Sequence, residues 1–302
     1  MLKFTPVNFR QERKYNALYG QCDEKSSDYT FINMWSWQDK YRYEWAFADN
    51  LCWLRHREGE KIVYNCPIGN WRRDDWKELL QKHFPAGFLF TRVPDALYGI
   101  LNEQFDEQLE MTEERDHWEY IYSIQELTSL NGYRFRNKRK LSNQFKQLYN
   151  YIYKKVEPEH IPDIIAFQRQ WLSQPEVSED KCLDGIKDEN RAVLRMLENW
   201  QKFPSEITGG FISIDGSIVA CALGEKIDDN TIAVHFEKAL YGFRGAYQAV
   251  NRIFLENVGC YYRFVNREQD LGIPGLRKSK LDYNPVRFIK KYTVSRQFST
   301  QE

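Results

Sequence analysis

The chain has 302 residues, enough for one large domain or two ordinary domains with a sizeable core. Its 43 basic and 43 acidic residues cancel, which excludes a general attraction to nucleic acid or membranes and leaves only local patches. Hydrophobic residues make up 42% and charged residues 28%, as in soluble globular proteins rather than fibrous or disordered ones.

Membrane, secretory and metal-binding signals are missing from the sequence. No window approaches the roughly 18 apolar residues of a membrane span, and the first residues lack a signal-peptide pattern. The cysteines form no CxxC or Cys/His cluster, so no metal site is indicated, and we expect reduced, mostly buried thiols in a cytoplasmic protein. They are Cys22, Cys52, Cys66, Cys182, Cys221 and Cys260.

The first half alternates helical and strand patterns, ending in a basic segment. Helices are expected at Val7–Tyr19, Tyr29–Trp37, Arg73–His83 and Asp95–Glu103. Strands are expected at Tyr43–Ala48, Leu51–His56, Lys61–Cys66, Gly87–Thr91, Glu107–Met111 and Trp118–Ser123. Seven of the nine tryptophans lie before residue 150, and we expect them to pack in the core.

The basic segment Tyr133–Tyr149 is predicted to be an amphipathic helix, with an apolar stripe that docks and a positive stripe. Through Arg134, Lys138 and Arg139 it can bind the phosphates of a tRNA or an anionic lipid surface. The alternative is a solvated helix face, which is the usual role of a charge run. A domain boundary is expected after this helix, giving domains 1–155 and 156–302.

The second half begins with two predicted helices and ends in an ordered series of strands. The helices are Pro162–Gln170 and Glu189–Gln201, and Ser173–Gly185 between them is predicted to be a mobile loop. Asp215-Gly216 predicts a tight hairpin turn, followed by a strand at Thr231–Leu240. The remaining elements are a Gly/Arg loop from Tyr241, a helix to Val258, a strand at Tyr261–Asn266, the segment Arg267–Lys280, and a last strand at Val286–Val294.

The Gly/Arg loop is suited to binding phosphates. A helix N-terminus presents free N–H groups and about +0.5 elementary charge, and glycine lets an anion approach the backbone. Gly242, Arg244, Gly245, Ala246 and Tyr247 are therefore predicted to hold the phosphates of a donor, either coenzyme A or a tRNA end. The alternative is a simple turn with a solvated Arg244.

Residues 266–280 read Asn-Arg-Glu-Gln-Asp-Leu-Gly-Ile-Pro-Gly-Leu-Arg-Lys-Ser-Lys. This segment resembles the signature of the lysylphosphatidylglycerol synthase C-terminal domain family, and the stretches Asp28–Trp37 and Leu130–Phe145 are also similar to that family. The resemblance implies an α+β fold of two tandem GNAT-like (acyl-CoA N-acyltransferase) domains, each a mixed, mostly antiparallel sheet flanked by helices. It also implies kinship with Fem-type aminoacyltransferases, which transfer amino acids from aminoacyl-tRNA.

The sequence departs from these relatives in two places. The lipid-modifying synthases carry membrane helices ahead of this domain, and none is evident here. The acetyl-CoA loop pattern Gln/Arg-x-x-Gly-x-Gly/Ala is imperfect, because with Gly245 as its central glycine the polar position is Gly242 and the last small position is Tyr247. The imperfect loop weakens a plain acetyl-CoA assignment without excluding coenzyme A.

The candidate reaction centre combines a strand with the segment after the next strand. Alternation places His235 and Glu237 on one strand face, where either can act as a general base or form a cross-strand pair. Asp270 with Glu237 can bind an ammonium group that Arg267 helps to orient; the alternative for Asp270 is a turn-capping role. Further predicted ligand contacts come from Asn266, Arg267, Arg277 and Lys280, and the resemblance to GNAT enzymes implies Tyr283 as a general acid.

The predicted function is transfer of an acyl or aminoacyl group from a phosphate-bearing donor, aminoacyl-tRNA, to an amine or hydroxyl on a small-molecule, peptide or lipid acceptor. No tightly bound cofactor is expected. The alternatives are a coenzyme-A-dependent N-acyltransferase and a degenerate domain that binds a nucleotide or peptide without catalysis.

Overall fold

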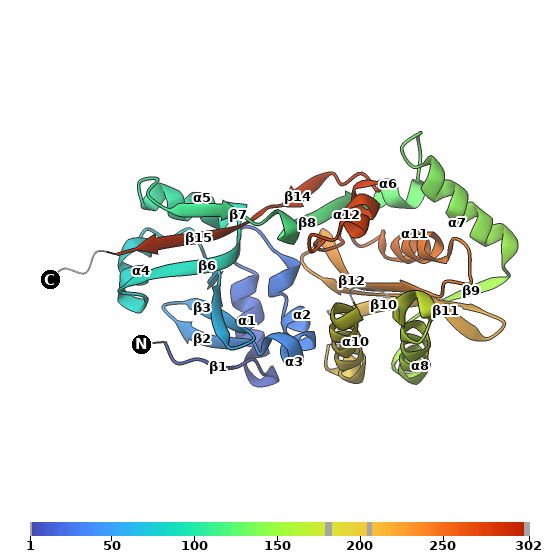
Figure 1. Ribbon diagram of the computed structural model, residues 1–302, viewed down its shortest axis with the longest axis horizontal. Coiled ribbons are helices and arrows are strands. Elements are labelled where there is room, and N and C mark those ends of the chain that lie inside the picture. Colours follow the sequence, from blue (N-terminus) through green and yellow to red (C-terminus); the bar gives the residue numbers. More distant parts are fainter. Residues whose placement is uncertain (1, 179–182, 204–206, 299–302) are drawn as a thin grey trace. The chain divides into compact units, whose positions relative to one another are not determined.

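The computed structural model describes residues 2–178, 183–203 and 207–298 (Figure 1). The chain forms two compact units. Unit 1 combines the residues up to Glu119 with Gln269–Ile273 and the segment from Phe288 onward, and unit 2 combines Tyr120–Glu268 with Pro274–Arg287. This division differs from the predicted boundary after residue 155, because Tyr151–Lys155 is a strand of the unit 2 sheet.

The sheet of unit 1 has the strand order β1-β2-β3-β4-β6-β15-β7, with β5 paired to β3. Its strands are β1 Thr5–Pro6, β2 Glu44–Ala48, β3 Leu51–Glu58, β4 Lys61–Asn65, β5 Ile68–Gly69, β6 Gly87–Pro94, β7 Glu110–Glu113 and β15 Lys291–Gln297. Its helices are α1 Glu12–Tyr19, α2 Phe31–Ser36, α3 Gln38–Tyr41, α4 Trp76–His83 and α5 Asp95–Gln104. β4 and β6 are parallel, and the helix between them is α4.

Buried aromatic side chains fill the core of unit 1. Trp45, Trp53, Trp71 and Trp76 are fully buried, which confirms the packing role predicted for them, whereas Trp35, Trp37 and Trp118 are half-buried. Thr30 caps α2 as its hydroxyl accepts a hydrogen bond from the Asn33 amide at 3.3 Å.

A buried ion cluster ties β15 into unit 1. Lys291 Nζ on β15 donates to the carboxylates of Asp28 and Glu119, the latter at 2.6 Å, and all three side chains are buried. Buried charges are stable only when each one is paired. The ion pairs of Lys291 therefore hold β15 in the unit 1 sheet in addition to its backbone hydrogen bonds with β6 and β7.

The sheet of unit 2 has the order β14-β8-β13-β12-β11-β10-β9. Its strands are β8 Glu119–Ser123, β9 Tyr151–Lys155, β10 Ile207–Ile214, β11 Ser217–Lys226, β12 Thr231–Ala239, β13 Phe264–Asn266 and β14 Arg287–Ile289. Its helices are α6 Ile124–Ser129, α7 Arg136–Leu148, α8 Ile161–Leu172, α9 Pro175–Ser178, α10 Leu183–Glu198, α11 Ala246–Val258 and α12 Pro274–Leu281. Helix α11 lies on one face of this sheet, and α8 and α10 lie on the other (Figure 1).

The two units repeat one order of elements. Each has an antiparallel meander, then a helix, then a strand parallel to the last meander strand: β2-β3-β4-α4-β6 in unit 1 and β10-β11-β12-α11-β13 in unit 2. This arrangement confirms the predicted α+β fold of two tandem GNAT-like domains with mixed, mostly antiparallel sheets.

Several predicted boundaries are wrong in detail. The single last strand, predicted at Val286–Val294, is two strands: β14 pairs with β8, and β15 lies between β6 and β7 in the other sheet. Helix α6 and strand β9 were not predicted. The predicted mobile loop Ser173–Gly185 contains α9 and the start of α10, and its residues 179–182, with Cys182, lie outside the described residues.

Candidate active site

The parallel strands β12 and β13 separate shortly after they begin. They pair only from Thr231 to Ala233, opposite Phe264 to Asn266. On its other side β12 carries a bulge: Val234 and Phe236 face the consecutive residues Gly224 and Leu223 of β11, which leaves His235 as the extra residue. Residues that follow the last pair of each parallel strand therefore have no backbone partner on the facing strand, and their side chains can meet across the separation.

Glu237 and Arg267 meet in this region. Arg267 Nη2 donates to Glu237 Oε1 at 3.0 Å, and Asn251 Nδ2 of α11 donates to Glu237 Oε2 at 2.7 Å. Both oxygens of Glu237 are thus occupied, although its side chain keeps 12% of its exposure and that of Arg267 keeps 15%. Burial alone lowers the pKa of Arg267, but Glu237 and two nearby tyrosines raise it above its ordinary value.

Aromatic rings and a lysine surround Arg267. Its guanidinium carbon lies 4.8 Å from the centroid of the Tyr283 ring and 5.8 Å from that of Tyr122. Lys138 of α7 places its ammonium 4.2 Å from the same Tyr283 ring. Burial raises the pKa of Tyr283 to about 12, so its hydroxyl is neutral and can donate a hydrogen bond.

His235 lies between two carboxylates and shares no hydrogen-bond partner with Glu237. Its Nε2 contacts Glu225 at 2.9 Å and its Nδ1 contacts Glu268 at 2.7 Å. Burial alone lowers the pKa of His235, but the two carboxylates outweigh it and raise the pKa to about 10. An imidazolium held on both sides has no free nitrogen with which to accept a proton, so this environment favours a structural role over a general base.

Asp270 belongs to unit 1, whereas Glu237 belongs to unit 2. Asp270 is fully buried, accepts from Arg115 at 3.1 Å, and accepts from the backbone amide of Gly272 at 2.9 Å. These contacts are those of the turn-capping alternative. The shared cation site of Glu237 and Asp270 stays a prediction.

Within the Gly/Arg loop, Gly245 has a structural task. It precedes α11 with φ of 83°, and a Cβ at this position would collide with the carbonyl oxygen of Leu141 on α7. Gly242 has open space around it. Arg244 is exposed, and its backbone amide donates to the Tyr149 hydroxyl at 3.2 Å.

Ala246, at the start of α11, is buried, and Tyr247 is anchored by its hydroxyl, which accepts from the Trp171 indole at 3.1 Å. Tyr247 thus supports packing between α11 and α8 where the acetyl-CoA pattern has a small residue.

The other predicted ligand residues support the backbone around Arg267. Asn266 is buried, and its side-chain oxygen accepts from the Glu268 amide at 2.8 Å. Lys280 Nζ donates to the carbonyl of Arg267 and, at 3.1 Å, to that of Glu268. Arg277 lies half-buried on α12, one turn before Lys280. Lys280 therefore holds the segment that presents Arg267.

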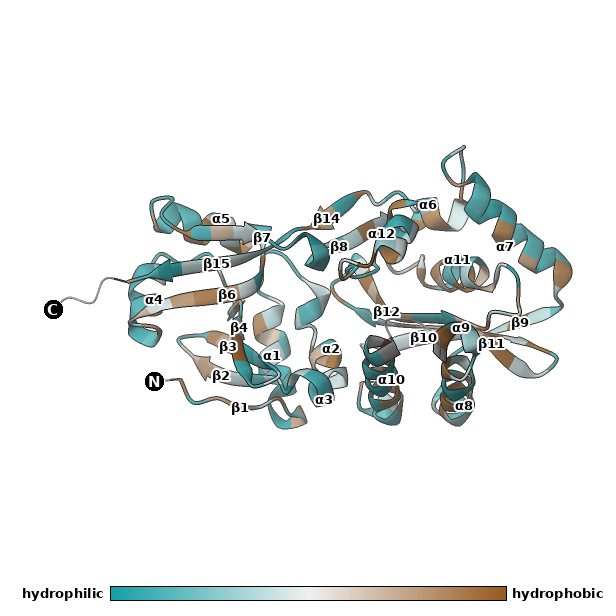
Figure 2. Cartoon of the chain, in the orientation of Figure 1, coloured by the Kyte–Doolittle hydropathy of each residue, from teal (hydrophilic) through white to brown (hydrophobic). Residues whose placement is uncertain are grey.

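The predicted tRNA contacts divide into different roles. Arg134 pairs with Glu126. Arg139 donates to the carbonyls of Leu130 and, at 3.1 Å, Gly132, which completes the end of α6. Lys138 lies beside Tyr283. The cations of α7 that are exposed are Arg136, Lys140 and Lys146, and Lys146 also lies 4.0 Å from Glu256. Figure 2 shows that most of α7 is coloured as hydrophilic.

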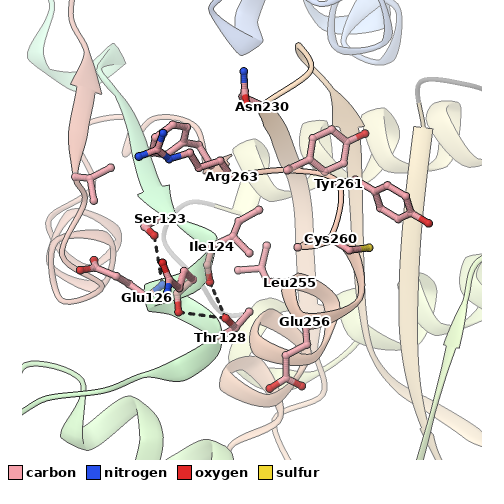
Figure 3. A pocket seen from close by; sticks show the side chains of 15 residues that line it. Ser123, Ile124, Glu126, Thr128, Asn230, Leu255, Glu256, Cys260, Tyr261 and Arg263 are labelled. Carbon is pink, nitrogen blue, oxygen red and sulfur yellow. Dashed lines mark hydrogen bonds between the residues drawn. The ribbon is translucent and has the colours of Figure 1, made fainter.

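A separate groove of about 990 Å³ lies at the opposite end of β13. Figure 3 shows Ser123, Glu126, Cys260, Tyr261 and Arg263 around it, with the Ser123 hydroxyl accepting from the Glu126 amide at 3.4 Å. None of the predicted site residues lines this groove.

Asn251, Tyr122 and Glu225 were missed from the sequence. An asparagine in the apolar stretch Ala249–Phe254 is a detectable signal, because a buried amide needs a partner. Tyr122 and Glu225 offered no such signal, since tyrosine and glutamate are common in strands of many sheets.

Residues 19–295 match the family model described as phosphatidylglycerol lysyltransferase, C-terminal. No curated protein matches the chain. Among the described residues no helix is both long enough and apolar enough to cross a bilayer.

The solved structures that resemble the chain include the following three. A conserved protein of unknown function from Bacteroides thetaiotaomicron has 29% identity and a TM-score of 0.88, covering 98% of this chain and 100% of that one. L-PGS from Bacillus licheniformis has 13% identity and a TM-score of 0.64, covering 98% and 94%. FemX has 10% identity and a TM-score of 0.51, covering 97% of each chain. The last two show a shared fold.

Proposed function

The chain belongs to the phosphatidylglycerol lysyltransferase C-terminal family, and from this premise we propose that it transfers an aminoacyl group from aminoacyl-tRNA to an amine or hydroxyl acceptor. Family and fold support an aminoacyl- or acyltransferase in general. The donor and the acceptor are the parts that we infer from the site.

The observation that carries the donor assignment is the contact between the Gly/Arg loop and the basic helix. Gly245 packs directly on the backbone of Leu141, so the loop and α7 are in contact. Arg244 on the loop and Arg136 and Lys140 on α7 are exposed cations of these two elements. A polyanion that spans several phosphates uses such a surface more fully than a single small cofactor does.

Glu237 is the proposed base. The acceptor amine or hydroxyl would give its proton to Glu237 and attack the ester carbonyl carbon of the aminoacyl group. The ester C–O bond then breaks, and the tRNA 3′-terminal ribose leaves with a proton supplied by Tyr283 or by Glu237. Arg267 stays next to Glu237 and stabilises the negative charge that develops on the carbonyl oxygen.

Coenzyme A is the alternative donor. A glycine in the left-handed region directly before α11 leaves a helix N-terminus that suits a pyrophosphate. Against it, Tyr247 replaces the small residue of the acetyl-CoA pattern and is bonded to Trp171. A third reading is a binding domain that has lost catalysis.

Binding and transfer measured on the same preparation separate these readings. Purified protein is titrated with radiolabelled aminoacyl-tRNA and with coenzyme A, and mixed acceptors are then scanned for label transfer. The proposal requires saturable tRNA binding and transfer. Coenzyme A binding without tRNA binding would favour the alternative, and tRNA binding without transfer to any acceptor would favour a non-catalytic domain.

A further inference from the structure

Two cations contact the ring of Tyr283, and neither has all its hydrogen-bonding groups satisfied. Lys138 Nζ lies 4.2 Å and the Arg267 guanidinium carbon 4.8 Å from the ring centroid. All three residues belong to unit 2. The ring fixes the positions of both charges, because a cation over an aromatic face is held by the ring quadrupole.

Donors are left over in this cluster. Arg267 Nη1 is buried and has no hydrogen-bond partner in the described part of the chain. Within residues 2–178, 183–203 and 207–298, Lys138 makes no hydrogen bond or ion pair, and it is half-buried. A buried donor without an acceptor is costly, so the cluster favours a ligand that supplies one.

The nearby carboxylates do not satisfy these donors. Both oxygens of Glu237 are already bonded, one to Arg267 Nη2 and the other to Asn251. Asp282, next to Tyr283, is exposed and influences Lys138 only through its charge. Burial and Arg267 lower the pKa of Lys138, as expected of an ammonium beside another cation with no anion in contact.

We propose that Lys138, Arg267 and Tyr283 form a binding subsite for an oxyanion, a phosphate or a carboxylate, carried by the acceptor. Arg267 Nη1 and Lys138 Nζ donate charge-assisted hydrogen bonds to it, and the Tyr283 ring between them holds both cations in place. The subsite adjoins Glu237, so an acceptor bound here presents its amine or hydroxyl to the base.

That the oxyanion belongs to the acceptor rests on the proposed function, whereas the subsite itself does not. The subsite is an alternative to recognition of an ammonium group at Glu237, whose two oxygens already accept from Arg267 and Asn251. The acceptor is then an acidic molecule whose nucleophile lies within a few bonds of a phosphate or carboxylate.

Anion titration tests the subsite without tRNA or turnover. Protein labelled with ¹³Cε-lysine and ring-labelled tyrosine is titrated by NMR with inorganic phosphate, and separately with acetate, at constant ionic strength. We expect saturable shifts of the Lys138 and Tyr283 signals. Lys138→Met should weaken anion binding tenfold or more, whereas Lys140→Met, an exposed neighbour on the same helix, should leave it unchanged.

The two anions distinguish the two sources. Tighter binding of phosphate supports a phosphate-bearing acceptor, and tighter binding of acetate supports a carboxylate-bearing one. Shifts that do not saturate, or equal affinity in the Lys138→Met and Lys140→Met variants, would overturn the subsite. If Lys138→Met does not fold, the wild-type shifts of Lys138 and Tyr283 decide alone. Loss of tRNA binding with intact anion binding would reject the proposed function and keep the subsite.

Discussion

Glu237 of β12 and Arg267, the first residue after β13, are joined at 3.0 Å between Oε1 and Nη2. The two strands pair for only three residue pairs before they part, and this ion pair follows the separation. The carboxylate is held by Asn251 on its other oxygen, which fixes its orientation.

Replacing Glu237 by Gln should abolish most transfer and spare donor binding. The amide keeps the size and one acceptor oxygen but cannot take a proton, so we expect transfer to fall by about 10²–10⁴-fold. Transfer of label and tRNA affinity are measured in parallel. Full turnover by Glu237→Gln would remove this residue from the mechanism.

Gly245→Ala should destabilise the protein and Gly242→Ala should not. Gly245 has φ of 83° and no room for a Cβ beside Leu141, whereas Gly242 has open space. The expected cost at Gly245 is about 1–3 kcal/mol, and at Gly242 it is within about 0.5 kcal/mol. Urea unfolding of the two variants compares them directly. Equal midpoints would show that α7 and the loop adjust their packing.

The pKa of His235 predicts a loss of stability at high pH. Its folded value of about 10 lies above the ordinary 6.5, so its contribution is complete below about pH 6.5 and is lost as the pH rises toward 10. The urea midpoint of the wild type should therefore fall toward that of His235→Gln over this range. NMR should show that the His235 imidazole is protonated at pH 8. A neutral imidazole at that pH would contradict its ion pairs with Glu225 and Glu268.

Neutralising the exposed cations of α7 should weaken tRNA binding. We expect Arg136→Gln with Lys140→Gln to fold normally and to show a shallower dependence of affinity on salt, since fewer counterions are released. The matched control, Lys61→Gln with Lys187→Gln, removes two exposed charges from β4 and α10. If both pairs change the salt slope equally, the binding surface is not α7.

Arg244→Ala should reduce affinity for the donor. Losing one charge-assisted contact costs about 1.5–3 kcal/mol, which corresponds to roughly 10–150-fold in the dissociation constant. Arg244→Lys keeps the charge and should retain most of the binding. Unchanged affinity of Arg244→Ala for both aminoacyl-tRNA and coenzyme A would exclude a phosphate contact by this side chain.

Local patterns determined most elements from the sequence alone. Asp215-Gly216 marks the hairpin of β10 and β11, and periodicity located α1, α4, α7 and α11 within a few residues of their observed bounds. Glu237 and Arg267 could also be proposed as neighbours, because residues at the ends of adjacent parallel strands share one edge of a sheet.

Only the tertiary structure decided which strand joins which sheet. Val286–Val294 reads as one strand, yet it divides at Lys290 into β14 and β15, and Lys291 is held by the carboxylates of Asp28 and Glu119. Periodicity reports that a segment is extended but carries no information about its partner, since pairing depends on contacts between residues far apart in the chain.

The same limit applies to the site. The sequence placed Lys138 on a basic helix and left Asp270 as either a cation ligand or a turn cap; the fold turns Lys138 toward Tyr283 and gives Asp270 contacts with Arg115 and the Gly272 amide. The identity of a charged residue determines which chemical groups its side chain can bind, because its charge and its hydrogen-bond donors are intrinsic. Which partner it binds is set by the helix face and the loop that the rest of the chain positions.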